Sequence, residues 1–333
     1  MGSIANLVLL IVGFILLIKG ADALVDGSSC MAKKLKVSGM VIGLTMVSMG
    51  TSAPELAVSV SASLKGANEM AISTIIGSNI FNVLGVLGLC ALLRPIPVLP
   101  SVRDKTFPYQ TLLAVILLFF IADSYLPWSP LYAGLDTFHP LNQNIGVLDR
   151  TEAVLLLFLF AVFIFETVSS EPKGRKKFST SEYSKSGYAA NILYIVGGIA
   201  ALAVGGNLAA DNACALAKAF GVSQTLIGLI IVGIGTSLPA LATSVAAVRK
   251  GENEIAVGNV IGSNIFNILF ILGISGFLHP MAVTMAAFID IGVLIIMSLY
   301  IFAYLLTRRA ISKFEGFTMI LIYILYTIYI IKR

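Results

Sequence analysis

Long apolar stretches, separated by short polar segments, run through the whole of this 333-residue chain. A helix needs about 20 mostly apolar residues to cross the hydrocarbon core of a bilayer. The stretches reach that length repeatedly, so the pattern predicts ten transmembrane helices. Their approximate limits are 4–32, 38–63, 70–93, 107–126, 150–169, 189–217, 223–248, 255–278, 281–305 and 314–331.

Composition supports the same class of protein. Hydrophobic residues make up 58% and charged residues 12% of the chain, whereas a soluble domain carries about 25% charged residues. We therefore expect an all-α membrane protein with the lipid bilayer as its main partner. The stretch 1–18 lacks a basic start and a cleavage site, so it is interpreted as the first helix rather than as a removed signal peptide.

The positive charge of the chain is better explained by membrane topology than by nucleic-acid binding. Cytoplasmic loops of membrane proteins are enriched in Lys and Arg. If the N-terminus lies outside, the inner loops hold most of these residues, and the outer side holds only Lys65, Arg150, Lys218, Lys332 and Arg333. We expect a multi-pass protein of the cell (cytoplasmic) membrane with both termini outside. The outer segment 125–149 is a long loop to which the sequence assigns no role.

Two short motifs occur twice in the chain. Gly-Thr-Ser-x-Pro begins at Gly50 and again at Gly235, and Gly-Ser-Asn-Ile-Phe-Asn begins at Gly77 and again at Gly262, always 185 residues apart. Roughly half of the positions between 20 and 88 match their partners at this offset. A duplicated polar stretch in apolar sequence is typical of transporters built from two repeats.

The repeat divides the chain into two parts of five spans. The first covers 1–169 and the second 189–333, and the Lys- and Ser-rich segment 170–188 is a cytoplasmic linker. Because five is odd, the second part enters the membrane from the opposite side. We therefore predict two inverted five-helix repeats, with a site where they meet near the midplane.

The first repeat offers a set of oxygen ligands. Thr51, Ser52 and Glu55 are predicted to share one helix face, and Ser78 and Asn82 present two more oxygens from the next span. Pro54 removes a backbone donor, which leaves a carbonyl oxygen open. Carboxylate, hydroxyl and amide oxygens suit hard cations such as Na⁺ or Ca²⁺. A charged group deep in a span also indicates function.

The second repeat mirrors this set with one change. Thr236, Ser237, Ser263 and Asn267 match their counterparts, but Ala240 stands where the first repeat has Glu55. We expect the two broken helices of the repeats to meet around one cation. No resident cofactor is expected. The three cysteines, Cys30, Cys90 and Cys214, lie in apolar segments without metal-ligand spacing.

Acidic residues elsewhere have more ordinary explanations. Asp22, Asp26 and Asp211 lie toward predicted helix ends, where structural pairing or interfacial exposure is expected. Glu69 and Glu254 lie near helix starts, where an acid either complements the helix dipole or recruits ions.

At the two motifs the sequence resembles the cation/calcium exchanger superfamily, most closely the prokaryotic sodium/calcium exchangers and their two α-repeats. The resemblance covers both halves. It implies ten helices in two inverted repeats and Ca²⁺ extrusion driven by Na⁺ entry. It places ion-ligating roles on Thr51, Ser52, Glu55, Ser78, Asn82, Thr236, Ser237, Ser263 and Asn267, with Glu55, Thr51 and Thr236 as direct ligands of Ca²⁺ or Na⁺.

Ala240 departs from the family pattern, which has a second acid at that position. Three interpretations remain open: weak Ca²⁺ binding completed by neutral oxygens and water, a shift toward monovalent Na⁺ or H⁺, or a change introduced to hold one conformational state. A cation/proton antiporter and a non-transporting sensor are therefore alternatives to Ca²⁺/Na⁺ exchange. An intramembrane metalloprotease is disfavoured, because the chain lacks His-Glu-x-x-His. The sequence leaves the oligomeric state open.

Overall fold

The computed structural model describes residues 3–66, 68–97, 99–122, 144–169, 187–219, 233–308 and 310–332. Almost all of them are helical. In the first half the helices are α1 (Ser3–Leu35), α2 (Gly39–Ile42), η1 (Gly43–Val47), α3 (Ser48–Thr51), α4 (Ala53–Leu64), α5 (Asn68–Ile80), η2 (Phe81–Val86), α6 (Leu87–Leu93), η3 (Val102–Thr106), α7 (Phe107–Ile121) and α8 (Arg150–Ser169). In the second half they are α9 (Tyr188–Ala219), α11 (Gly233–Lys250), α12 (Asn253–Phe266), η8 (Asn267–Ile271), α13 (Leu272–Leu278), α14 (Met285–Thr307) and α15 (Lys313–Lys332). The segments labelled η are π-helical.

The membrane-spanning character of the chain is confirmed. Within the described ranges, eight helices are long and apolar enough to cross a bilayer. A ninth span results if the bent pair Gly39–Thr51 and Ala53–Leu64 is taken as one. The predicted span 223–248 lies partly outside the described residues, and its described part is α11. The predicted linker lies almost wholly outside them as well.

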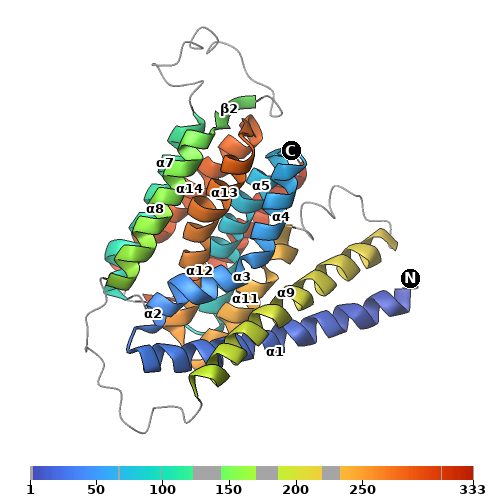
Figure 1. The fold of residues 1–333 in the computed structure, drawn as a ribbon, viewed down its shortest axis with the longest axis vertical. Helices are drawn as coiled ribbons and strands as arrows, with labels where there is room; N and C mark the ends of the chain where they lie inside the picture. Colours follow the sequence, from blue (N-terminus) through green and yellow to red (C-terminus); the bar gives the residue numbers. More distant parts are fainter. Residues whose placement is uncertain are drawn as a thin grey trace.

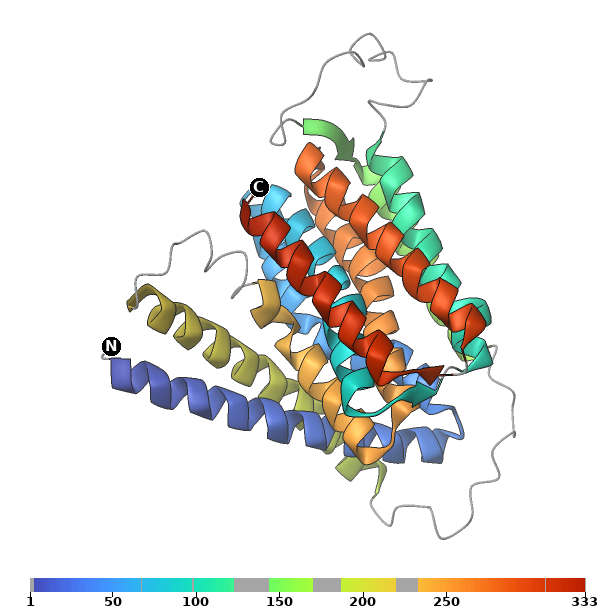
Figure 2. The same ribbon diagram turned by 180° about the vertical axis from the view of Figure 1, so that it is seen from behind.

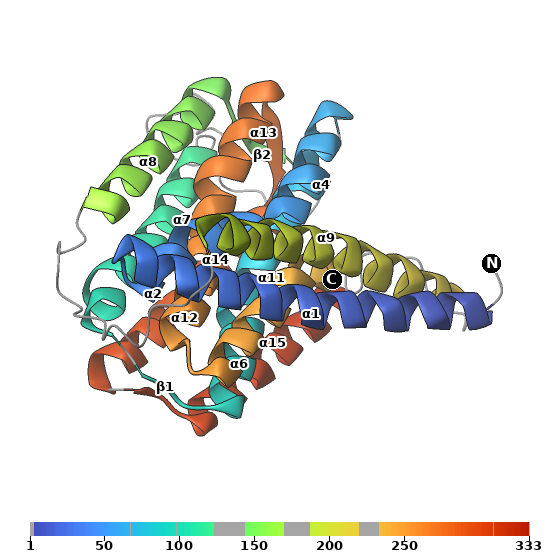
Figure 3. The same ribbon diagram turned by 60° about the horizontal axis from the view of Figure 1, so that its bottom comes forward.

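The helices form a bundle with a two-helix arm. In Figures 1 and 3, α1 and α9 run side by side and extend from the bundle toward the end that carries the N-terminus. Glycines allow this close contact: a Cβ atom added to Gly13 would lie 2.9 Å from the Gly205 carbonyl oxygen, and one added to Gly20 would lie 3.0 Å from that of Gly198. Backbones this close leave no room for larger side chains.

Two short antiparallel ribbons join loops at opposite ends of the bundle (Figure 2). β1 (Ile96–Pro97) pairs with β4 (Ala310–Ile311), and β2 (Asn144–Leu148) pairs with β3 (Met281–Thr284). The all-helical prediction missed both, because ribbons this short depend on which loops the bundle brings together. β2 also shows that the end of the predicted loop 125–149 is an ordered strand.

Contacts between the two halves come in pairs. In each pair, the second contact joins the equivalent elements with the roles of the halves exchanged. The last helix of the first half, α8, packs on α13 of the second half, and α15 packs on α6. The two ribbons likewise each join one segment of the first half to one of the second. The α1–α9 contact has the same property, because Gly13 and Gly198 are equivalent in the repeat, as are Gly20 and Gly205. Figure 2 shows α14 and α15 covering one face of the bundle.

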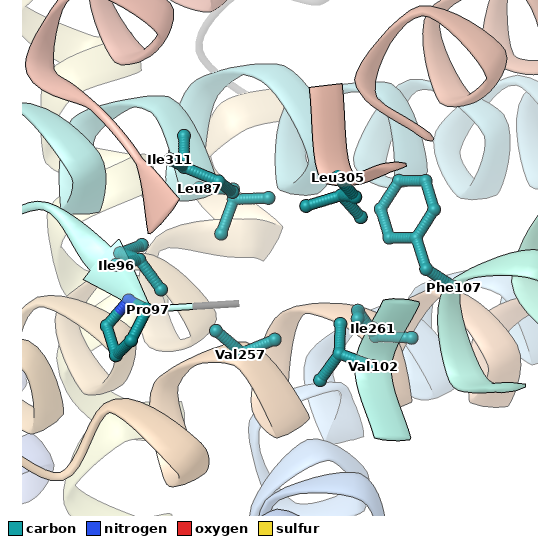
Figure 4. A pocket seen from close by; sticks show the side chains of 9 residues that line it. All are labelled: Leu87, Ile96, Pro97, Val102, Phe107, Val257, Ile261, Leu305 and Ile311. Atoms are coloured by element: carbon teal, nitrogen blue, oxygen red, sulfur yellow. The ribbon is translucent and has the colours of Figure 1, made fainter. Parts of the chain in front are cut away.

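The core contains an apolar pocket beside the β1–β4 ribbon, but its chemistry is unsuited to ions. Figure 4 shows its lining side chains converging from both halves of the chain. All of them are hydrocarbon: Leu87, Ile96, Pro97, Val102, Phe107, Val257, Ile261, Leu305 and Ile311. Since such a lining offers no ligand to a cation, the candidate site must be sought among the buried polar residues instead.

Candidate functional site: a buried oxygen cluster between the two halves

Glu55 lies at the centre of a buried polar cluster. It is 1% exposed and occupies the first turn of α4. Its Oε1 atom lies 3.3 Å from Ser78 Oγ and 3.1 Å from Ser237 Oγ, and the two serine hydroxyls are 2.8 Å apart. The carboxylate of the first half is thus bonded to a hydroxyl from each half. The structure brings together these three predicted site residues, which come from α4, α5 and α11.

The chain bends at Ser52, which lies between Thr51 and Glu55. Thr51 ends α3, and Ser52 has φ −91° and ψ 7°, a conformation between helix and extended chain that is common at functional sites. α4 then departs at 49° to the preceding helices, with Pro54 in its first turn. The prediction that Thr51, Ser52 and Glu55 share one helix was therefore wrong. The preceding turn is also interrupted, since η1 is π-helical.

The second half is built differently at this point. The helix α11 runs from Gly233 to Lys250 with Pro239 inside it and without a break. The expectation of a broken helix in both halves was wrong for the described part of α11. A proline removes one backbone bond and kinks a helix, but packing can carry the helix past it. Here the proline ring lies against α9, where a Cβ added to Gly206 would be 3.3 Å from Pro239 Cγ.

Four asparagines form a reciprocal network across the two halves. Asn79 Nδ2 donates to the Asn264 carbonyl oxygen and Asn264 Nδ2 to that of Asn79, both at 3.3 Å. Asn82 Nδ2 donates to Asn264 Oδ1 at 3.1 Å, and Asn267 Nδ2 to Asn79 Oδ1 at 2.9 Å. Asn79 is equivalent to Asn264 in the repeat, and Asn82 to Asn267. Contacts between equivalent residues that exchange in this way are the mark of two-fold symmetry.

The network also fixes which amide atoms remain available. Because the Nδ2 atoms of Asn82 and Asn267 are used, their Oδ1 atoms are left to face other partners. Both oxygens are buried and have no hydrogen-bond partner among the described residues, as is also true of Glu55 Oε2 and Ser263 Oγ. Unpaired buried polar atoms are costly, and all four are oxygens. A set of unpaired oxygens from both halves is suited to a hard cation.

The other predicted site residues lie nearby on the same elements. Thr51 donates to Asn259 Oδ1 at 2.8 Å, a contact between the halves. Ser52 is buried at the break, and Thr236 is partly exposed and precedes Ser237 on α11. Ala240 is fully buried and brings no charge to the cluster.

Sequence reasoning missed three asparagines. Asn79 and Asn264 lie inside the duplicated motif, which could have indicated them. Asn259 lies outside both motifs, and its equivalent position holds Thr74, so the repeat gave no signal for it.

Comparison with known proteins identifies close relatives over the whole chain. Residues 5–168 and 190–332 match the family model described as sodium/calcium exchanger protein. The inner membrane protein YrbG of Escherichia coli is 36% identical over 91% of this chain and 89% of its own length. The sodium/calcium exchanger MaX1 of Methanosarcina acetivorans is 34% identical over 97% of both chains.

A solved structure agrees with these relatives. The sodium-calcium exchanger NCX_Mj, soaked with 10 mM Na⁺ and no Ca²⁺, superposes with a TM-score of 0.80 at 28% identity. The match covers 97% of this chain and 98% of that one.

Proposed function

This chain belongs to the sodium/calcium exchanger family, and from that membership we propose that it is a secondary antiporter exchanging Ca²⁺ for Na⁺ across a membrane. The observation that carries the proposal is the Glu55 cluster: the buried carboxylate contacts a serine hydroxyl from each half, and buried oxygens of predicted site residues in both halves lack hydrogen-bond partners among the described residues. The proposed ligands are Glu55, Thr51, Ser52, Ser78, Asn82, Thr236, Ser237, Ser263 and Asn267. The transported ions are its substrates. Of the named relatives, MaX1 and NCX_Mj are described as sodium/calcium exchangers, which favours a transporter over an enzyme.

The transport cycle we propose uses two inverted repeats, 1–169 and 189–333, joined by the linker 170–188. The exchanged contacts of the asparagine network and of α1 with α9 support a two-fold relation between them. Such a relation favours alternating access, in which one bundle moves against the other around a fixed midplane site. We place this cycle in the cell membrane, with the linker in the cytoplasm and both termini outside.

Ala240 supports a second candidate within transport. Glu55 is the only carboxylate among the proposed ligands. A bound Na⁺ or a proton therefore neutralises the site, whereas a bound Ca²⁺ leaves it positive in a low-dielectric interior, which is costly. The chain is then a cation/proton antiporter or a relative shifted toward monovalent ions. Weak Ca²⁺ binding, completed by neutral oxygens, is the form of the first proposal compatible with the same residue.

Vesicle flux separates these candidates. The purified protein is reconstituted into liposomes, and uptake of radiolabelled Ca²⁺ is measured against outward Na⁺, K⁺ or H⁺ gradients in parallel, with a pH-sensitive dye inside. Ca²⁺/Na⁺ exchange requires uptake only with the Na⁺ gradient and no dye response. A dye response on cation addition identifies proton exchange. Cation binding without any flux would contradict both and favour a sensor.

A further inference from the structure

Asn259 lies where the acid-free half meets the first half. It is on α12, is fully buried, and contacts three groups. Its Nδ2 atom lies 3.2 Å from the Ala240 carbonyl oxygen and 2.9 Å from Ser244 Oγ, and its Oδ1 atom accepts from Thr51 Oγ1 at 2.8 Å. The Asn259 amide therefore connects the backbone of Ala240, where the first repeat has an acid, to Thr51, a proposed ligand from the opposite repeat.

The contacts of Asn259 determine the orientation of its amide. A backbone carbonyl can only accept a hydrogen bond, so the atom facing Ala240 O must be the NH₂ group. The Oδ1 atom then faces Thr51, and the Thr51 hydroxyl must be the donor in that contact. A rotated amide would place two acceptors against each other at Ala240, which excludes the alternative assignment.

This orientation matters for a cation. A hydroxyl that ligates a cation through its lone pairs must direct its proton to another acceptor. Asn259 Oδ1 is that acceptor for Thr51. The other acceptor within reach is the Ser48 carbonyl oxygen, at 3.2 Å and only three residues back along the same helix. The shorter contact comes from the opposite half, so it also holds α3 against α12.

We propose that Asn259 is a positioning residue of the cation site, which orients the Thr51 hydroxyl so that its lone pairs face the ion and which occupies the side of the site left neutral by Ala240. The inference deepens the proposed function and rests on it. Only the half without the acid has this positioning amide, because the equivalent residue of the first half is Thr74. Outer-shell partners of metal ligands typically contribute about 10- to 100-fold in affinity.

The test is a mutant cycle on transport by the full-length protein in liposomes, with Na⁺ and Ca²⁺ as probes. Asn259→Ala is expected to raise the KM for the transported cation about tenfold with little change in the maximal rate. Thr51→Val is expected to raise it at least as much. In the Asn259→Ala background Thr51→Val should add little, because the hydroxyl then donates to the Ser48 carbonyl oxygen instead and its lone pairs are no longer directed at the ion.

If Asn259→Ala does not fold, a second substitution at Asn259 still tests the proposal. Asn259→Gln retains both the acceptor oxygen and the NH₂ group without adding a charge, so Thr51→Val should there cost as much as in the unaltered protein. Ser63→Ala is the matched control: Ser63 Oγ is buried and donates to the Ser275 carbonyl oxygen outside the site, and its effect should add to that of Thr51→Val.

The outcomes are distinct from those that test the function itself. If the unaltered protein transports and the effects of Asn259→Ala and Thr51→Val simply add, Asn259 is a packing residue and the inference is overturned. The same holds if Thr51→Val loses its effect in Asn259→Gln. If the unaltered protein shows no flux but binds the probe cations with affinities that follow the pattern above, the site assignment stands and antiport fails.

Discussion

The two halves of this protein agree in the four asparagines of the network and differ in their charge. Asn79 and Asn82 make the same bonds within the network as Asn264 and Asn267, with the roles of the halves exchanged. One contact lies outside this exchange: Asn267 Nδ2 also lies 3.4 Å from Ser78 Oγ. Glu55, in contrast, faces Ser237 from a bent helix, and its equivalent is Ala240 on a continuous one. The asparagine network is therefore a scaffold to which both halves contribute, whereas the negative charge comes from the first half alone.

The difference extends to the surroundings of the two positions. In the second half the neighbourhood of residue 240 contains the amide of Asn259 and the hydroxyl of Ser244. The Asn259 amide distinguishes the two halves, because Thr74 occupies its equivalent position, whereas Ser244 has the equivalent Ser59. A neutral amide thus lies beside the backbone of the residue that has no acid. A site of this kind balances one positive charge fully and two only in part, which is why ion choice is the property most sensitive to the comparison.

The largest expected effect is the loss of Glu55. A unit charge 4 Å from a monovalent cation contributes about 4 kcal/mol at an effective dielectric constant of 20, so Glu55→Ala and Glu55→Gln should weaken cation binding about a thousandfold. Isotope flux and calorimetry measure this. The matched control is Glu315→Gln, which alters a buried carboxylate that caps α15 through Ser312 and should leave exchange intact. Unchanged flux in Glu55→Gln would place the site elsewhere.

Restoring the symmetry of charge is the next largest change. Ala240→Glu should raise the preference for Ca²⁺ over Na⁺ by at least about tenfold, because a second carboxylate attracts a divalent ion twice as strongly. Competition between Na⁺ and Ca²⁺ in the flux assay gives the ratio. Ala240→Gln has the same size without the charge. An equal gain in both variants would attribute the effect to shape and refute the electrostatic explanation.

The scaffold is tested by altering one copy at a time. Asn79→Ala and Asn264→Ala each remove one donated bond and leave one amide donor of the other repeat unpaired. Each should therefore lower the free energy of unfolding by about 1–2 kcal/mol. The two costs should be similar, because the remaining contact of Asn267 Nδ2, with Ser78 Oγ, is long at 3.4 Å. Thermal unfolding in detergent measures both. The amide of Asn212 bonds, among the residues that the structure describes, only to the Leu208 carbonyl of its own helix, so Asn212→Ala should cost less. Clearly unequal costs for the first two would break the equivalence of the halves.

The smallest expected effect concerns the charged ends of the repeat. Lys250 lies 2.8 Å from Asp26 and 3.3 Å from Asp22 on α1, while the equivalent Lys65 makes no ion pair with any residue that the structure describes. These groups are partly exposed, so Lys250→Ala should cost no more than about 1 kcal/mol and Lys65→Ala less. Unfolding at low and high salt measures the difference, which salt should reduce. A larger loss for Lys65→Ala would contradict the expectation.

Much of the site followed from duplication alone. The repeated motifs indicated Glu55, Ser78 and Ser237, which the structure brings into contact, because an equal offset in two copies predicts equivalent places in space. Motifs give residue types but not directions. They could not tell that Asn79 and Asn264 orient the amides of Asn82 and Asn267, since that depends on which backbone oxygens meet where the halves pack.

Backbone geometry was harder to predict from the sequence. Both copies contain a proline after Thr-Ser, yet the chain breaks at Ser52 and continues through Pro239, because the surrounding helices decide whether the lost hydrogen bond becomes a bend. Asn259 had no counterpart in the repeat to indicate it. The expected pairing of acidic residues at helix ends is confirmed for Asp22 and Asp26, but the partner is Lys250 from the other half.

The reciprocal network of four asparagines constrains how a duplicated gene can diverge. A substitution at Asn79 removes a bond that it donates to the second half and leaves an Asn267 donor unsatisfied, so one mutation affects both copies at once. Positions 55 and 240 have no such mutual dependence, and there the copies have drifted apart. The two halves can therefore differ in charge at positions 55 and 240, whereas the asparagine contacts between them require the same residues in both copies.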